Sequence, residues 1–252
     1  MGAHAGAVPE ILLEVDPRLR SLLPLGRRDG SLLMRADSTD SVGHVVQSAG
    51  IPHTEVGGLL LDGEPVPWSA TARAGTLAIA PVERPQTAPT EPPRFLLDVH
   101  LGALARRMRI LGLDTAYDRQ ADDADLAVRA AVQGRVLLTQ DRGLLKRRAV
   151  IAGALVTGQR VDDQLADVLD RFAPPLAPWT RCPACNGTVR PADAAEVRNG
   201  LEPGTARTYA TFARCERCGR VYWRGAHSAR LEPMVVRAQD VVRRRRGSAA
   251  SE

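Results

Sequence analysis

The chain has 252 residues, of which 44% are hydrophobic and 25% charged, a composition typical of a globular protein with two or three small domains. Its first ten residues lack a basic start followed by an apolar run, and no segment has the apolar length that spans a bilayer, so we expect a cytoplasmic protein with no membrane contact. The formal charge of +5 is carried almost wholly by arginine, which favours a nucleic-acid partner, although GC-rich codons produce the same bias.

The first block, residues 8–82, is predicted to be a β-grasp domain. Strands are expected at Glu10–Val15, Ser31–Arg35, Leu59–Leu61 and Thr76–Pro81. Apolar residues at helical spacing predict a helix over Ser41–Ala49, with Asp40 or Ser41 as its cap and Gly50 as its stop. The order strand, strand, helix, strand, strand is that of a β-grasp fold.

Two segments of this block, IPHTEVGGLLLDGEPVPW and ATARAGTLAIAPV, resemble the ubiquitin-like and sulfur-carrier domains. Carriers of that group react at a free Gly-Gly terminus, whereas here the last strand continues into Glu83 and Arg84. The sequence therefore argues against a carrier role and favours a domain on which a protein partner docks. Residues 83–93 are rich in proline and are expected to form an extended linker.

The second block, residues 94–174, begins with a short apolar strand that ends at Asp98. The helical stretch LGALARRMRILG follows, and Gly112 stands where a helix stop is expected. Its apolar stripe is formed by Leu101, Leu104, Ala105, Met108 and Leu111. The other faces are left to Arg106, Arg107 and Arg109.

The rest of this block continues the alternation of strand and helix. Further strands are expected at 115–118, 135–141 and 153–157, and further helices at 122–134 and 162–172. Such alternation is typical of an α/β domain whose parallel sheet is covered on both sides.

Three acids, Asp98, Asp118 and Asp141, end strands of this sheet. Ligands of open α/β sheets bind beyond the carboxyl ends of the strands, and carboxylates that converge there suit a hard cation such as Mg²⁺ or Mn²⁺. A metal at this edge would orient water and neutralise charge on a phosphodiester, so the pattern predicts a metal-dependent nuclease. Flanking phosphates would be gripped by Arg106, Arg107, Arg142, Lys146 and Arg147.

Plainer roles are open for several acids of this block. Asp122 and Asp125 occupy the positions of a helix cap and its partner, and Asp123 between them would favour the helix dipole. Asp98 and Asp141 are harder to explain in this way, because each follows apolar strand residues and an unpaired buried carboxylate is costly.

The third block, residues 178–228, contains four cysteines in two CxxC pairs, Cys182 with Cys185 and Cys215 with Cys218. Two such turns complete a tetrahedral structural zinc site, although redox or disulfide pairs are the alternative. Trp223 either stacks on an RNA base or covers the small zinc core. Residues 229–252 contain an Arg243–Arg246 run and are expected to be a frayed basic tail.

The ordered stretches FLLDVHLGALARRMRILGLDTAYD, ADDADL, GRVLLTQDRGLLKRR, RCPACNG and CERCGRVYWRGAH resemble the Mut7-C RNase-domain family, and the first block resembles its companion ubiquitin-like domain. The resemblance implies a PIN-like nuclease fold with a zinc ribbon and metal-dependent RNA cleavage. By position, Asp98, Asp123 and Asp141 match the catalytic acids of such folds. A fourth acid often follows the third, whereas residues 142–161 contain none, so either Asp162 or Asp163 folds back or the acid set is reduced.

The expected function is therefore that of a ribonuclease with a carboxylate-bound Mg²⁺ or Mn²⁺ and a structural zinc. The alternative is a non-catalytic RNA-binding or adaptor protein that keeps the PIN-like fold.

Overall fold

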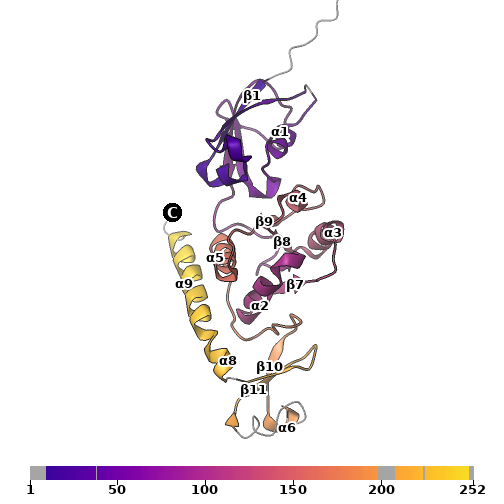
Figure 1. Ribbon diagram of the computed structural model, residues 1–252, viewed down its shortest axis with the longest axis vertical. Helices are drawn as coiled ribbons and strands as arrows, with labels where there is room; N and C mark the ends of the chain where they lie inside the picture. The colour runs from indigo at the N-terminus through magenta and orange to yellow at the C-terminus, as the bar shows by residue number, and fades with distance from the viewer. Residues whose placement is uncertain (1–9, 38, 198–207, 224, 250–252) are drawn as a thin grey trace, which may run out of the picture. The chain divides into compact units, whose positions relative to one another are not determined.

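The computed structural model describes residues 10–37, 39–197, 208–223 and 225–249. Its contacts divide the chain into two units. Unit 1 contains Met1–Glu83 and Asp141–Leu155, and unit 2 contains Arg84–Gln140 and Val156–Glu252. Figure 1 shows the chain coloured from its N-terminus to its C-terminus.

Unit 1 is built around a five-stranded sheet with the order β2-β1-β5-β3-β4. Its strands are β1 (Glu10–Val15), β2 (Ser31–Arg35), β3 (Val56–Leu61), β4 (Glu64–Pro65) and β5 (Gly75–Pro81). The first and last strands pair in parallel at the centre, and the other pairs are antiparallel. Helix α1 (Val42–Ser48) is capped by Ser41, whose Oγ accepts the N–H of His44 at 3.1 Å. The predicted β-grasp domain is confirmed.

The core of this domain lies between the sheet and α1. Alternate residues of β1 and β5 point inward, as the period of two in a strand requires, and Ile11, Leu13, Leu77 and Ile79 are buried there. Short 3-10 helices at Pro17–Leu22, Leu25–Arg27 and His53–Glu55, and the two-residue strand β4, were not apparent from the sequence pattern. These elements are too short to produce a periodic signal.

The segment Asp141–Leu155 completes unit 1, with helix α4 (Arg142–Leu145) and strand β9 (Gly153–Leu155). Hydrogen bonds between described residues attach it to the β-grasp domain. Arg142 donates through Nη1 to the Leu22 carbonyl at 2.6 Å, and His53 Nε2 lies 2.8 Å from the Val150 carbonyl. The N–H of Leu155 donates to Glu55 Oε1 at 2.8 Å.

Unit 2 contains three of the four strands of the central sheet, whose strand order is β7-β6-β8-β9. Strand β6 (Phe95–Leu97) lies between β7 (Thr115–Tyr117) and β8 (Val136–Thr139) and is parallel to both. A single 3-10 turn, η4 (Val99–Leu101), leads from β6 into helix α2 (Gly102–Ile110), and helices α3 (Asp123–Gln133) and α5 (Val161–Phe172) follow. The predicted α/β architecture is confirmed, and Figure 1 shows these helices packed around the strands.

The core of the central domain contains the apolar stripe predicted for α2, together with the strands. The five predicted stripe residues are all buried, and the Phe95 and Phe172 rings meet edge to face with centroids 5.4 Å apart. The prediction for Arg109 was wrong, because this arginine is not on an outer face but only 5% exposed. Its guanidinium is buried among backbone carbonyls that accept its hydrogen bonds.

The C-terminal part of unit 2 carries a three-stranded antiparallel sheet with the order β10-β11-β12. Its strands are β10 (Val189–Ala192), β11 (Phe212–Cys215) and β12 (Val221–Trp223), and the short helices α6 (Ala194–Val197) and α8 (Ala226–Ala229) flank it. Strand β12 follows the second CxxC pair and is antiparallel to β11.

The prediction of a frayed basic tail was wrong, because residues Glu232–Ala249 form helix α9. Met234, Ala238 and Val242 recur every four residues and are buried, which gives the helix one apolar face. Helix α9 packs against α5, where Arg245 forms an ion pair with Asp170. No helix in the described ranges combines the length and the apolar run that crossing a membrane requires.

Candidate functional site

Asp98 is the most buried of the predicted catalytic acids. It directly follows β6, stands at the N-cap position of η4 without a side-chain capping hydrogen bond, and is only 5% exposed. Its Oδ2 accepts a 2.6 Å hydrogen bond from Thr139 Oγ1 at the end of the neighbouring strand β8. A carboxylate has about four acceptor positions, and this one receives a single hydrogen bond from the described residues. The remaining acceptor capacity is what a cation or a water molecule would use.

Asp123 is the first residue of α3 and is half-buried. The cap of this helix is Asp122, whose Oδ1 accepts the N–H of Asp125 at 2.8 Å, so the predicted cap is confirmed. Asp118, at the end of β7, is held by Arg129 at 3.1 Å and by the N–H of Gln120 at 3.0 Å. The hydrogen bond from the Gln120 N–H, followed by that from Arg129, lowers the pKa of Asp118.

Asp141 belongs to unit 1, is exposed and caps the short helix α4. Its Oδ1 accepts the N–H of Gly143 at 2.6 Å. The predicted phosphate-binding residues Arg142 and Lys146 lie in the same segment. Arg142 donates a hydrogen bond to the Leu22 carbonyl. Burial, together with the charge of Arg142, lowers the pKa of Lys146. A metal site formed jointly by Asp98, Asp123 and Asp141 stays a prediction.

The four cysteines form a cluster that can hold a metal ion. Their four sulfur atoms all lie within 4.8 Å of one another. Within the described ranges, no other group of three or more His, Cys, Asp or Glu residues is placed to hold a metal ion. Sulfur atoms of Cys182 and Cys218 lie 3.7 Å apart, and those of Cys185 and Cys215 lie 3.5 Å apart. Tetrahedral zinc with bonds of about 2.3 Å would place sulfurs about 3.8 Å apart, whereas a disulfide requires about 2.05 Å. The donor set and its spacing therefore fit a zinc ion.

The two CxxC turns have the same local geometry. Asn186 and Gly219, just after each second cysteine, adopt left-handed backbone conformations with φ of 67° and 71°. Tyr222 from β12 places its hydroxyl 2.9 Å from the Cys182 sulfur. Burial opposes ionisation of Cys182, but the Tyr222 hydroxyl and nearby backbone N–H groups lower its pKa to about 6. Burial and the neighbouring thiols instead raise the pKa of Cys185 to about 12, so a bound metal ion would have to displace the proton of that thiol.

Trp223 is 40% exposed and lies beside Tyr209, with ring centroids 6.3 Å apart. Both rings line a largely apolar hollow of about 690 Å³ in the ribbon, together with Trp179 and Phe212. Tyr222 also borders this hollow, but its hydroxyl is directed to Cys182. A base-stacking role for Trp223 stays a prediction.

The first cysteine turn is docked on the edge strand β7. Asn186 accepts the N–H of Thr115 through Oδ1 at 2.9 Å, and Arg109 donates through Nε to the Thr115 carbonyl at 2.9 Å. Arg109 also donates through Nη1 to the carbonyls of Pro183 and Ala184, both at 3.1 Å. One buried arginine thus joins α2, β7 and the cysteine turn, and its burial lowers its pKa.

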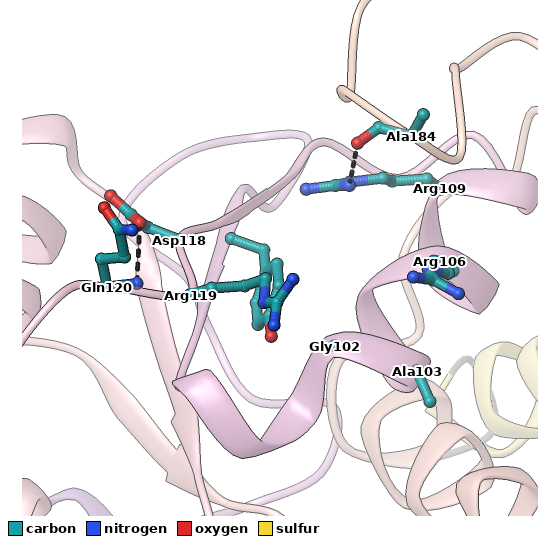
Figure 2. A pocket seen from close by; sticks show the side chains of 9 residues that line it. Gly102, Ala103, Arg106, Arg109, Asp118, Arg119, Gln120 and Ala184 are labelled. Carbon is teal, nitrogen blue, oxygen red and sulfur yellow. Dashed lines mark hydrogen bonds between the residues drawn. The ribbon is translucent and has the colours of Figure 1, made fainter.

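A pocket of about 820 Å³ opens next to this junction, and we call it the arginine pocket (Figure 2). It is lined by Gly102, Ala103, Arg106, Arg109, Tyr117, Asp118, Arg119, Gln120 and Ala184. The pocket borders the carboxyl end of β7 and the first turn of α2. Of the residues predicted to bind RNA phosphates, the structure brings Arg106 into this pocket.

Arg109 and Arg119 of the pocket were not among the predicted binding residues. Arg106 and Arg109 are three positions apart on α2 and therefore lie on neighbouring parts of the helix surface. This spacing could have indicated from the sequence that the two arginines share one site. Arg119 lies in the loop after β7, where sequence periodicity is uninformative. Arg107 lies outside this pocket, 3.8 Å from Asp162 at the start of α5.

Comparison with known proteins agrees with this architecture. The Mut7-C ubiquitin domain matches residues 8–87, and the Mut7-C RNAse domain matches residues 93–235. No curated protein and no solved structure matches the chain. The RNAse-domain match covers more than half of the chain, so the family follows from sequence and architecture together: the chain belongs to the Mut7-C RNAse domain family and carries the associated Mut7-C ubiquitin domain.

Proposed function

We propose that this protein is a metal-dependent ribonuclease that hydrolyses RNA phosphodiester bonds. The observation that carries the proposal is the burial of Asp98 at the carboxyl end of a central parallel strand, with one hydrogen bond from Thr139 to satisfy it. A buried carboxylate that lacks an ion-pair partner is costly, and a functional cation would compensate that cost. Membership of an RNAse-domain family supports RNA as the substrate.

In this proposal Asp98, Asp123 and Asp141 hold Mg²⁺ or Mn²⁺. When bound, the metal supplies an activated water and charge neutralisation at the phosphodiester. Thr139 orients the Asp98 carboxylate through its 2.6 Å hydrogen bond. RNA phosphates and bases are contacted by Arg106, Arg107, Arg142, Lys146, Arg147 and Trp223.

The proposed division of labour follows the blocks of the sequence. Residues 94–174 form the PIN-like nuclease domain, residues 178–228 the zinc ribbon, and residues 8–82 a domain that docks a protein partner. The linker at 83–93 joins the docking domain to the nuclease domain. A cytoplasmic location stays a prediction from the sequence.

The test is cleavage of labelled single-stranded RNA by the purified protein with Mn²⁺ or Mg²⁺. Asp98→Asn keeps the side-chain shape and removes its charge, so we expect a loss of rate on the order of a hundredfold, because a catalytic metal supplies several kcal/mol. Asp125→Asn is the matched control, since Asp125 is an exposed acid paired with Arg129. Equal rates for the wild type and Asp98→Asn would contradict the proposal.

A second function is favoured by one observation. Residues 142–161 contain no carboxylate, and Asp162 lies 3.8 Å from Arg107, where an ion pair competes with metal binding. The alternative is accordingly a non-catalytic RNA-binding or adaptor protein. Wild-type protein that binds the RNA, contains zinc and yields no cleavage with either metal would establish this alternative.

A further inference from the structure

The arginine pocket has a strong excess of positive charge. Arg106, Arg109 and Arg119 line it, and the one carboxylate among its lining residues is Asp118. That carboxylate forms an ion pair with Arg129 from α3, which also pairs with Asp125. Three guanidinium charges therefore line a hollow that has only one carboxylate among its lining residues.

Arg109 gives the pocket a fixed donor. Its Nε and Nη1 groups are held by the carbonyls of Thr115, Pro183 and Ala184, which orients the planar guanidinium. Nη2 receives no acceptor from the residues that the structure describes, although the side chain is 95% buried and lines the pocket. Because Arg109 lines the pocket, its Nη2 group can donate to an anionic oxygen that enters it.

Arg106 and Arg119 are exposed and adjustable donors at the same pocket. Neither side chain forms an ion pair or a hydrogen bond with the described residues. Figure 2 shows Arg106 on α2 and Arg119 on the loop after β7, so the two approach the pocket from different elements. Arginines from different elements suit a phosphate group, which offers several acceptor oxygens in different directions.

The dimensions of the pocket fit a ligand larger than a simple anion. Its volume of about 820 Å³ lies in the range of pockets that hold whole small-molecule ligands. One wall is the ring of Tyr117, which is fixed because its hydroxyl donates to the Val99 carbonyl at 2.8 Å. Gly102 permits this placement, since a Cβ there would lie 2.7 Å from the Tyr117 hydroxyl oxygen. A fixed aromatic ring beside phosphate donors is typical of sites for single-stranded nucleic acid.

We propose that the arginine pocket binds one nucleotide of a single-stranded RNA, with its backbone phosphate held by Arg106, Arg109 and Arg119. The inference rests on the proposed RNA substrate and deepens it, because it assigns to Arg109 and Arg119 a role in holding the strand beside the carboxyl end of β7. The cysteine turn takes part by fixing Arg109 through its two carbonyls.

The test measures RNA binding apart from cleavage. Full-length Asp98→Asn protein is titrated with a labelled single-stranded RNA over a range of salt concentrations, with and without the further substitutions Arg106→Gln and Arg119→Gln. Both side chains are exposed, so their replacement should leave folding intact. The control carries Arg27→Gln and Arg35→Gln, two exposed arginines of the β-grasp domain that remove the same charge elsewhere.

We expect the pocket variant to bind RNA roughly tenfold more weakly and to lose about 1.4 from the slope of log affinity against log salt, because two phosphate contacts of a single strand are removed. The control should keep its slope. Equal affinity and slope for the pocket variant and the control would overturn the proposal. Binding of inorganic phosphate or a mononucleotide at this pocket without any effect of the substitutions on RNA would likewise overturn it.

The outcome is separable from that of the proposed function. Loss of binding in the pocket variant together with no cleavage by the wild type would support the pocket and refute the nuclease. Cleavage by the wild type together with unchanged RNA binding in the pocket variant would support the nuclease and refute the pocket.

Discussion

Asp114 illustrates how one side chain connects the central sheet to the cysteine-rich part of unit 2. Its Oδ1 accepts hydrogen bonds from Arg135 and from the Asn186 amide, both at 2.8 Å, and Arg181 lies 3.5 Å from Oδ2. Burial opposes its ionisation, but the hydrogen bonds from Arg135 and Asn186 outweigh burial and lower the pKa of Asp114. The charged form therefore stabilises the junction between β7 and the first cysteine turn.

Asp114→Asn should lower the free energy of unfolding of unit 2 by about 2 kcal/mol at pH 7, because Arg135 and Arg181 lose a partly buried anionic partner. Since the folded-state pKa is below that of the unfolded chain, this stabilisation is complete above the unfolded value near 4 and is lost as pH falls through the lower folded value. Urea unfolding followed by tryptophan fluorescence from pH 7 to pH 3 measures the difference.

The control for this measurement is Asp240→Asn, which breaks an exposed ion pair with Arg243 within helix α9. Such a pair contributes a few tenths of a kcal/mol, so the variant should unfold almost as the wild type does. A difference between Asp114→Asn and the wild type that grows as the solution is acidified would contradict a lowered pKa for Asp114.

Among the elements, those with complete local signals could be predicted from the sequence. Helix α3 has Asp122 as its cap and Gly134 in a left-handed conformation as its end, and both ends were predictable because the residue types act locally. Helix α9 was not predicted, because its run of arginines dominates the sequence pattern and its sparse apolar residues become a buried face only through packing against α5. The burial of Arg109 was equally hidden, because its acceptors Pro183 and Ala184 are more than seventy residues away.

The cysteine cluster is an element whose stability should depend on metal. Metal analysis should find one zinc per chain, and chelation should release the first cysteine turn from β7. The amide of Thr115, which donates to Asn186 Oδ1, should then exchange with solvent much faster, whereas amides of β1 in unit 1 should not change. Absence of zinc, or unchanged Thr115 exchange after its removal, would contradict the assignment.

At the scale of the whole molecule, the attachment of Asp141–Leu155 to the β-grasp domain was not predictable from the sequence. The stretch reads as one strand-and-helix repeat of the central domain, and nothing local marks Leu22, His53 and Glu55 as its partners. Pattern analysis finds elements by periodicity, whereas this attachment depends on single hydrogen bonds between distant residues. The candidate catalytic residue Asp141 therefore lies in a segment that is hydrogen-bonded to the ubiquitin-like domain.

Glu55→Ala should loosen this segment, because the N–H of Leu155 loses its acceptor. We expect trypsin to cut after Lys146, Arg147 or Arg148 roughly tenfold faster than in the wild type, as local opening becomes more frequent. Glu64→Ala, at an exposed position of β4, is the control and should leave the cutting rate unchanged. Identical rates for all three proteins would show that Glu55 does not hold the segment.

The course of the backbone between the two units constrains the order of folding. It leaves unit 1 after Glu83, re-enters at Asp141 and departs again after Leu155. On the ribosome, β1 to β5 are complete long before Leu155 emerges, and the bond to Glu55 closes a span of 100 residues. Closing so long a span is slow. During biosynthesis the N-terminal domain therefore exists for a time without the segment Asp141–Leu155 that completes unit 1.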